Sequence, residues 1–179
     1  HHELLALPNG NKLMMSYPVR TGVDITALGA GYGASESVVD GWLQEIRPDG
    51  TVAWEWHSED HISPAETTAH YDGLYIGAET PSGHVTDLVH LNSIDIDPTN
   101  GNVVVSARHL DAVFEIRRNP GQPDDGTIVW KLGGNTPTSP TTKDLTIVGD
   151  PFGGPRRQHD ARLTADGRLT MFDNESNTA

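Results

Sequence analysis

Cysteine is absent from the 179-residue sequence. Its absence excludes disulfides, zinc sites built on thiolates and thiol nucleophiles, so any nucleophile must come from another side chain. Long apolar runs are absent as well, whereas a helix that crosses a bilayer needs about 20 consecutive apolar residues. The sequence therefore predicts no transmembrane segment and a nucleophile that is not a thiol.

Basic residues are scarce. The chain has 12 Lys and Arg against 25 Asp and Glu, which gives a formal net charge of −13 at neutral pH. Nucleic-acid binding depends on clustered Lys and Arg that displace counterions from phosphates, so nucleic acid is not an expected partner. The excess of acidic side chains is interpreted as a solvated surface.

Short segments rich in β-branched and aromatic residues dominate what remains, with a periodicity near two that is typical of strands. The predicted strands include residues 43–46, 51–54, 103–105, 112–116 and 127–130. Turn-forming Pro, Asn, Asp and Gly residues separate strands at 8–11, 48–50, 98–101 and 165–167. Only two isolated helical turns are expected, over Ser63 to Ala69 and Ser35 to Asp40. The predicted fold class is all-β.

Two kinds of internal repeat decide the expected architecture. In the first kind, a strand, a glycine turn and a strand containing Trp occupy residues 42–56 and again 113–132. In the second kind, a histidine followed by a strand, a turn and a strand begins at His2, at His90 and at His159. The first and third copies of this kind have the same spacing, and the middle copy has a three-residue insertion in its turn.

Joined in order, the two kinds of repeat make a four-stranded antiparallel unit, which is typical of a β-propeller blade. Residues 1–179 are therefore interpreted as one partial β-propeller domain of about three to four blades, each of about 40–50 residues. The sequence begins and ends inside a repeat, so this domain is expected to be truncated at both ends.

The histidines that begin equivalent strands are the candidate functional residues. Inner strands of a propeller run beside its central channel, so His2, His90 and His159 are expected to converge on one site. Further hydrogen-bond donors lie close to them in the sequence: Asn92, Arg108, His109, Arg156 and Arg157. Arg presents a planar fork of donors and imidazolium forms charge-assisted hydrogen bonds, so this set predicts binding of an anion with several oxygens, such as a sulfate or phosphate ester.

At these residues the sequence resembles a known family, the PAPS-independent arylsulfotransferases. Five segments carry the resemblance, in order and at blade spacing: His1-His2-Glu3, His90-Leu91-Asn92-Ser93, Ser106-Ala107-Arg108-His109, Gln158-His159-Asp160-Ala161 and Phe172-Asp173-Asn174. Residues 130–134, Trp-Lys-Leu-Gly-Gly, are similar to the end of an outer strand in that family. The resemblance spans nearly the whole chain.

The resemblance implies a six-bladed propeller that transfers a sulfuryl group from a phenolic sulfate ester to a phenolic acceptor through a sulfated histidine. It implies that His159 is the nucleophile, that His90 and Arg108 hold the sulfuryl oxygens, that Asn92 assists, and that His2 completes the ring of donors. His109 and Arg157 extend the expected substrate-binding set. No cofactor and no metal are expected, and the resemblance implies a periplasmic or secreted location. The chemistry is sound because a neutral imidazole, with an ordinary pKa of about 6.5, is a competent nucleophile at neutral pH.

Several residues also have structural interpretations. A histidine on an inner strand often has only a structural role, as a hydrogen-bonded side chain. His1 and His2 could also be the remainder of an affinity tag. His57 and His61 have the spacing of a metal pair on a helix, but a strand and an acidic loop flank them. Asp95, Asp97 and Asn100 resemble a calcium loop without its closing Glu, and are interpreted as a turn. Trp54 and Trp130 are expected to pack within blades, and Arg117, Arg118, Arg156 and Arg157 to be solvated.

Two other functions are compatible with the sequence. A propeller without catalytic activity could bind an anionic ligand or a protein at the same histidines. A quinoprotein-like dehydrogenase is suggested by the segments Gly50-Thr51-Val52-Ala53-Trp54 and Gly126-Thr127-Ile128-Val129-Trp130, although the vicinal cysteines often seen in such sites are absent.

Overall fold

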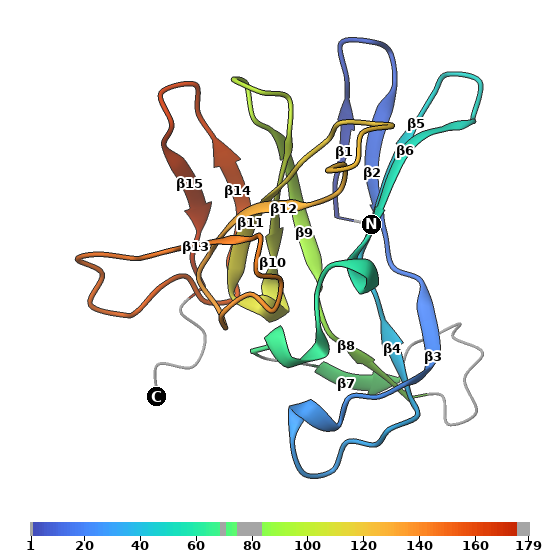
Figure 1. Ribbon diagram of the computed structural model, residues 1–179, viewed down its shortest axis with the longest axis vertical. Coiled ribbons are helices and arrows are strands. Elements are labelled where there is room, and N and C mark those ends of the chain that lie inside the picture. The colour runs from blue at the N-terminus through green and yellow to red at the C-terminus, as the bar shows by residue number, and fades with distance from the viewer. Residues whose placement is uncertain (1, 69–70, 75–83, 175–179) are drawn as a thin grey trace.

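The computed structural model describes residues 2–68, 71–74 and 84–174, which form strands, loops and four short 3-10 helices (Figure 1). No α-helix occurs in these residues, and the prediction of an all-β fold is confirmed. Within the same residues, no helix has the length and apolar character that crossing a membrane requires.

The first sheet unites a His-led hairpin with a Trp-containing hairpin. Its order is β1 (Leu4–Ala6), β2 (Lys12–Ser16), β5 (Trp42–Ile46) and β6 (Val52–His57), and all its neighbours are antiparallel. This is the four-stranded unit that the repeats predict, except that two further strands intervene in the sequence between β2 and β5.

The second sheet repeats the same plan. It contains β9 (Leu91–Ile96), β10 (Val103–Ala107), β11 (Ala112–Ile116) and β12 (Ile128–Leu132) as antiparallel neighbours, and β13 (Lys143–Leu145) adds a parallel edge strand. A third His-led hairpin, β14 (His159–Leu163) with β15 (Leu169–Phe172), forms a two-stranded sheet. The described residues thus contain two complete units of the predicted kind and the first half of a third.

A fourth sheet, the inserted sheet, is not predicted by the repeats. It consists of β3 (Val19–Val23), β4 (Glu36–Val39), β8 (His84–Asp87) and β7 (Tyr71–Leu74), in that order, and lies at the lower end of Figure 1. Strands β4 and β8 pair in parallel, although 44 residues separate Val39 from His84 in the chain.

Both expected helical turns need correction. Residues 36–39 form β4, because Val38 and Val39 bury their branched side chains while the backbone pairs with β3 and β8. Near Ser63 there is a 3-10 helix, Pro64–Glu66, whose start is capped by the Ser63 side chain. It ends at once, because the backbone N–H of Thr68 donates to the carbonyl of His109. Ala69 lies outside the described residues.

The core lies between the first and second sheets. Leu13, Met15 and Leu43 from the first sheet belong to one buried cluster with Leu91, Ile94, Val105 and Phe114 from the second. On the opposite face of the second sheet, Val104 and Val113 pack with Ala161 of β14. Both faces of β10 are therefore covered, which explains why it is apolar at successive positions. Trp54 and Trp130 pack in these two clusters, as expected.

Polar side chains connect neighbouring sheets through the core. Gln158 is the residue before β14 and is fully buried. Its side-chain amide donates to the backbone carbonyls of Ala107 and Ala112. Glu3, the residue before β1, accepts from the backbone N–H of Ile94 in β9 at 2.6 Å and from Arg162 in β14 at 2.5 Å. Arg118, which was expected to be solvated, is paired with the buried carboxylate of Glu45 on the first sheet, because that carboxylate requires a cationic partner.

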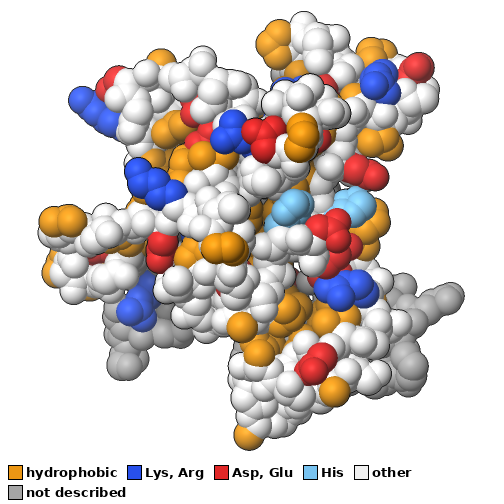
Figure 2. Space-filling model, in the orientation of Figure 1, with side chains coloured by type: hydrophobic (Ala, Val, Ile, Leu, Met, Phe, Trp, Pro, Cys, Tyr) orange, Lys and Arg blue, Asp and Glu red, His pale blue; other side chains and the backbone are white. Residues whose placement is uncertain are grey.

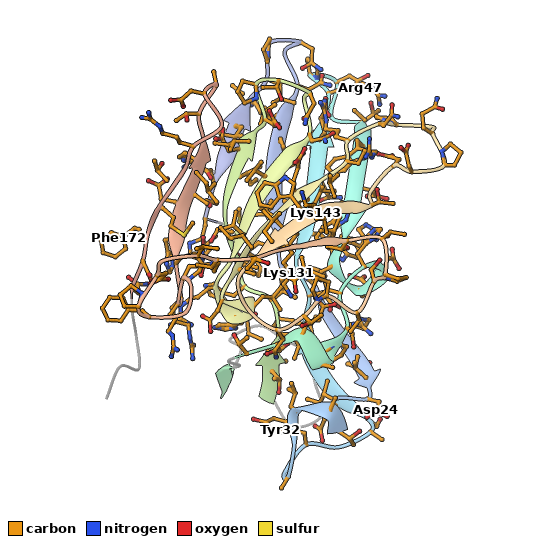
Figure 3. The ribbon with its side chains drawn as sticks, turned by 60° about the vertical axis from the view of Figure 1, so that its left-hand side comes forward. Asp24, Tyr32, Arg47, Lys131, Lys143 and Phe172 are labelled. Atoms are coloured by element: carbon orange, nitrogen blue, oxygen red, sulfur yellow. The ribbon has the colours of Figure 1, made fainter. Side chains whose placement is uncertain are left out.

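A buried ion pair stabilises the segment between β6 and β7. Lys131 Nζ lies 2.8 Å from Glu66 Oε2 and donates to the Asn135 carbonyl at 2.7 Å. The other carboxylate oxygen of Glu66 accepts from the backbone N–H and the hydroxyl of Thr138. Figure 3 shows Lys131 among the packed strands, whereas Lys143 on the adjacent β13 is exposed.

Candidate functional site

The three strand-leading histidines lie together. The ring centroid of His2 is 5.2 Å from that of His90 and 6.3 Å from that of His159. Tyr17 borders the same group, with its ring 6.1 Å from His2 and 5.9 Å from His90. We call His2, Tyr17, His90 and His159 the histidine cluster.

The start of each His-led strand positions its histidine. His2 precedes β1, His90 directly precedes β9, and His159 is the first residue of β14. Strand β9 contacts both β1 and β14, so its neighbours bring the three histidines to one end of adjacent strands.

Backbone strain accompanies this arrangement. Among the described residues, four that are not glycine have positive φ angles: His90 (52°), Asp111 (49°), Arg157 (53°) and Asp160 (55°). One is a cluster histidine and two flank His159. Such left-handed conformations cost free energy and persist where surrounding contacts enforce them, as the 2.7 Å hydrogen bond from the Arg157 N–H to Asp111 Oδ1 does here.

Hydrogen bonding determines which nitrogen of His159 is available. His159 Nδ1 lies 2.9 Å from the backbone carbonyl oxygen of Arg157, and a carbonyl only accepts, so Nδ1 carries the proton. Asn174 Nδ2 donates to the same carbonyl at 2.7 Å and lies 3.2 Å from the ring nitrogen. In this neutral tautomer, Nε2 keeps its lone pair.

Burial and nearby positive charge favour the neutral form of His159. Partial burial lowers the pKa of His159 below its ordinary value; the hydrogen bond to the Arg157 carbonyl raises it, and the charges of Arg108 and His90 lower it further. The pKa of His2 is also lowered, first by burial and then by His90 and His159. Both shifts favour the neutral imidazole of His159 and of His2.

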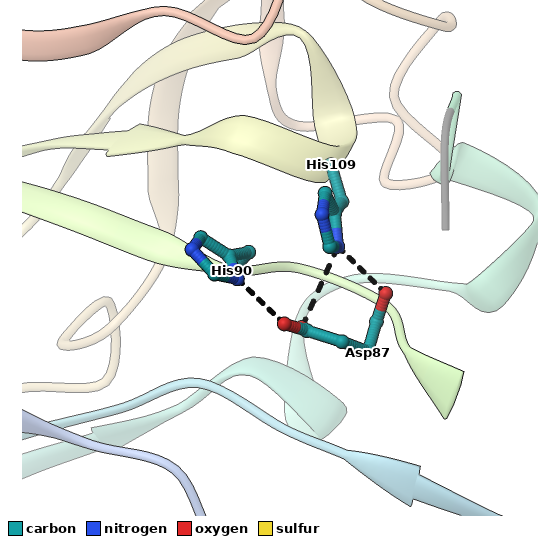
Figure 4. A group of neighbouring side chains, drawn as sticks. All are labelled: Asp87, His90 and His109. Atoms are coloured by element: carbon teal, nitrogen blue, oxygen red, sulfur yellow. Dashed lines mark hydrogen bonds and ion pairs between the residues drawn. The ribbon is translucent and has the colours of Figure 1, made fainter. Parts of the chain in front are cut away.

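Arg108 is held at the edge of the cluster by a chain of hydrogen bonds. Arg108 Nη1 lies 2.7 Å from His109 Nε2, and His109 Nδ1 lies 2.7 Å from the backbone carbonyl of Asp87. Because guanidinium only donates, Nε2 of His109 accepts and Nδ1 donates. On the other side, Asp87 Oδ2 lies 2.6 Å from His90 Nδ1 (Figure 4).

The structure changes the interpretation of three expected substrate-binding residues. His109 is only 1% exposed and both its ring nitrogens are engaged, one of them by Arg108. Asn92 is buried and donates to the Gln158 carbonyl at 2.7 Å, which ties β9 to the residue before His159. Arg157, expected to be solvated, has a side chain that is only 17% exposed, with its Nε 3.6 Å from Asp111 Oδ1. Arg156 is exposed.

Asp87, His90 and His109 form the one group of three potential metal ligands in the described part of the chain. The geometry does not fit a cation, since the guanidinium of Arg108 already occupies Nε2 of His109 and its Nδ1 donates a proton. His57 and His61 belong to no such group in the described residues; their rings stack on Trp42 and Trp56 respectively.

The segment that resembles a calcium loop is a turn. Asp97 Oδ1 accepts from the N–H and hydroxyl of Thr99, and Oδ2 accepts from Asn100 Nδ2, so its carboxylate is used within the turn.

On the face drawn in Figure 2, Lys and Arg side chains are interspersed with acidic side chains and form no continuous basic patch. A cavity of about 380 Å³ lies beside the inserted sheet, away from the histidine cluster, and Arg20, Asp24, Glu59, Asp60 and His61 contribute to its lining. Its lining has three carboxylates against one arginine, which does not suit a sulfate ester, so the histidine cluster is the better candidate site.

Sequence reasoning missed Asp87 and Tyr17. Asp87 stands three residues before His90 at the end of β8, and this spacing was the available signal. Tyr17 lies in the connection after β2, with no motif that marks it. Asp87 reaches the cluster from the end of β8 in the inserted sheet, and Tyr17 reaches it from the connection after β2 in the first sheet.

Comparison with known families gives an independent line of evidence. The family model described as Arylsulfotransferase (ASST) matches residues 1–179, the whole chain. No curated protein matches the sequence.

Proposed function

The chain belongs to the arylsulfotransferase (ASST) family, and we propose that it moves a sulfuryl group from a phenolic sulfate ester to a phenolic acceptor through a sulfated His159. Membership supports arylsulfotransferase-type activity in general. The observation that carries the specific mechanism is the tautomer of His159, whose Nδ1–H is engaged by the Arg157 carbonyl and whose Nε2 is left nucleophilic.

The reaction divides into two displacements at sulfur. In the first, His159 Nε2 attacks the sulfur of the aryl sulfate, the N–S bond forms and the S–O bond to the aryl group breaks. The departing phenoxide takes a proton from a second histidine of the cluster, which is an imidazolium before the step and a neutral imidazole after it. The Nδ1 proton stays on His159, so the positive charge that develops on its ring faces the Arg157 carbonyl.

In the second displacement, the acceptor phenol attacks the same sulfur. The new S–O bond forms, the N–S bond breaks, and the phenol's proton passes to the imidazole that gave one up in the first step. His159 returns to its neutral tautomer, and no redox cofactor enters the balance.

Donors around the cluster suit the negative oxygens of the transferred group. Arg108 supplies a guanidinium whose charge already acts on His159, and His90 and His2 supply ring nitrogens within the same group. Because His109 and Asp87 hold Arg108 in place before substrate binds, little reorganisation is needed in the transition state.

The proposal places the cluster at the axis of a propeller. The two four-stranded units and the half unit supply their first strands, β1, β9 and β14, in adjacent positions, as inner strands of successive blades do. The six-bladed ring, and the division of residues 1–179 into about three to four blades, are part of this proposal. The inserted sheet is not a His-led unit.

Mass spectrometry of the complete protein tests the proposed nucleophile. After brief exposure to an aryl sulfate and acid-free digestion, the peptide that contains His159 should gain the mass of one sulfuryl group. The modification should disappear when a phenol is added. A peptide that stays unmodified while donor is consumed would contradict the proposal.

The pH dependence of kcat/KM offers a second test. The nucleophile must be neutral, which holds above its pKa, and that pKa is lowered from 6.5 by burial and by Arg108 and His90. We therefore expect the acidic limb of the profile to fall only below pH 6.5, measured with a donor whose phenolate is stable enough to need no proton. An acidic limb centred above the ordinary histidine pKa would contradict this, provided that circular dichroism shows an intact fold throughout.

A further inference from the structure

Asp87 lies where the inserted sheet meets the histidine cluster. It is the last residue of β8, and the chain runs from it through Leu88 and Val89 to His90 and strand β9. The 3-10 helix Arg108–Leu110 docks on this connection, since the Arg108 N–H donates to the His90 carbonyl and the His109 N–H to the Val89 carbonyl. This short connection thus brings together one carboxylate, two imidazoles and one guanidinium, which belong to Asp87, His90, His109 and Arg108.

The carboxylate of Asp87 is charged and only partly satisfied. Burial raises the pKa of Asp87, but hydrogen bonds from His109 and His90 outweigh it, and the pKa falls to about 2. Oδ2 lies 2.6 Å from His90 Nδ1, and Oδ1 lies 3.6 Å from His109 Nδ1. The side chain is 17% exposed. An anion held between two imidazoles controls the orientation and protonation of both.

We propose that Asp87 is a positioning residue of the sulfuryl-transfer site, which makes His90 the proton carrier and, through His109, holds Arg108 against the transferred group. The inference rests on the proposed function. Asp87 accepts the Nδ1 proton of His90, so Nε2, on the side of the ring turned away from Asp87 in Figure 4, exchanges protons with the phenols.

The proton balance follows from this tautomer. In the first displacement, His90 is an imidazolium paired with the Asp87 carboxylate, and its Nε2–H passes to the oxygen of the departing phenoxide. His90 is then neutral, with its remaining proton on Nδ1. In the second displacement, Nε2 takes the proton of the acceptor phenol, which restores the imidazolium and returns the site to its starting state.

Asp87 also acts on Arg108, through His109. The Asp87 backbone carbonyl and carboxylate both face Nδ1 of His109, which fixes the tautomer whose Nε2 accepts from Arg108 Nη1. Since His109 is 1% exposed, it transmits position and does not contact substrate. Asp87 is therefore expected to influence both proton transfer and sulfuryl binding although it touches neither phenol nor sulfate.

The experiment compares Asp87→Asn with Asp24→Asn in the complete protein, using a series of aryl sulfates that differ in the acidity of the phenol released. Asp24 is a matched control: it follows β3 of the same inserted sheet and is exposed, and Figure 3 shows it at the lower end of the molecule, away from Lys131. We expect Asp87→Asn to lower kcat by about 10- to 100-fold, with the larger losses for weakly acidic phenols, which need a proton most. Asp24→Asn should leave the whole series unchanged. An equal loss for every ester would overturn the proposed role in proton transfer.

Two further measurements separate this inference from general misfolding and from the proposed function. In a double variant with His90→Gln, the Asp87→Asn change should cost less than it does alone, because one of the two groups it acts through is gone. Additive losses would contradict the role of Asp87 in proton transfer. Imidazole ¹⁵N NMR, recorded at a pH high enough for His90 to be neutral, reports its tautomer without turnover. We expect Nδ1 to be protonated in the wild type, and a shift in the tautomer balance in Asp87→Asn.

The outcomes distinguish the two proposals. If the wild type transfers no sulfuryl group to His159, the proposed function fails and this inference fails with it. If the wild type forms sulfated His159 but Asp87→Asn behaves as Asp24→Asn does in kinetics and NMR, only the role of Asp87 is refuted. Asp87→Glu, which keeps the charge, should recover part of the lost rate if the fold is intact.

Discussion

Replacing His159 with glutamine is expected to lower the turnover of aryl sulfates by at least about 1,000-fold, because the covalent route through Nε2 is removed while the surrounding donors remain. Glutamine retains a polar side chain of similar reach but offers no nucleophilic nitrogen. Steady-state kinetics with a chromogenic aryl sulfate measure the loss, and the mass gain on the peptide containing position 159 should vanish with it.

His57→Gln is the matched control for that change. His57 is also a partly buried histidine, 24% exposed, but it stacks on Trp42 in the first sheet and does not belong to the histidine cluster. Its replacement is expected to leave turnover within about twofold, as surface-proximal changes away from a site usually do. Wild-type turnover in His159→Gln, or sulfation transferred to another residue without loss of rate, would show that His159 is not the nucleophile.

The largest expected effect on stability comes from Lys131→Met. This change leaves the Glu66 carboxylate buried without its cation, and breaking one side of a buried ion pair typically costs about 3–5 kcal/mol. Glu66 is 3% exposed and its remaining partner is Thr138, which cannot neutralise its charge. Urea unfolding near neutral pH measures the difference in the free energy of unfolding.

The pH of that measurement matters. Burial raises the pKa of Glu66, but the hydrogen bonds from Lys131 and Thr138 lower it to a net value below the ordinary 4.5. A carboxylate with a lowered folded-state pKa stabilises the fold above its unfolded pKa, and that contribution is lost as the pH falls through the folded value. At neutral pH the contribution is complete.

Two further variants complete the test. Lys143→Met changes an exposed lysine on the adjacent strand and is expected to cost no more than about 0.5 kcal/mol. Lys131→Met combined with Glu66→Gln removes both charges and is expected to recover a substantial part of the stability, because no isolated charge remains buried. Equal stabilities of the Lys131 and Lys143 variants would show that the buried pair contributes little.

Local patterns explain why most strands were predictable. Branched apolar side chains alternate or follow one another within a few positions in residues 43–46, 103–105 and 112–116. Glycine turns lie between such segments, so residues close in the sequence are enough to predict these strands and their hairpins. The inserted sheet was missed because its pairing joins β4 to β8 across a long stretch of chain. The segment 35–40 forms strand β4 and not the predicted helical turn. Its serine and acidic residues give no strand pattern, and the strand forms only through pairing with β3 and β8.

The sequence by itself determined that a thiol takes no part in the chemistry, that the chain builds repeated four-stranded units, and that His2, His90 and His159 stand at equivalent strand starts. These are properties of composition and period, which a linear chain displays directly. Only the tertiary structure decided that Nε2 of His159 is free, that His109 is buried behind Arg108, and that Asp87 joins His90 to His109. Proton positions and burial depend on atoms brought together from separate sheets, and no local pattern records such contacts.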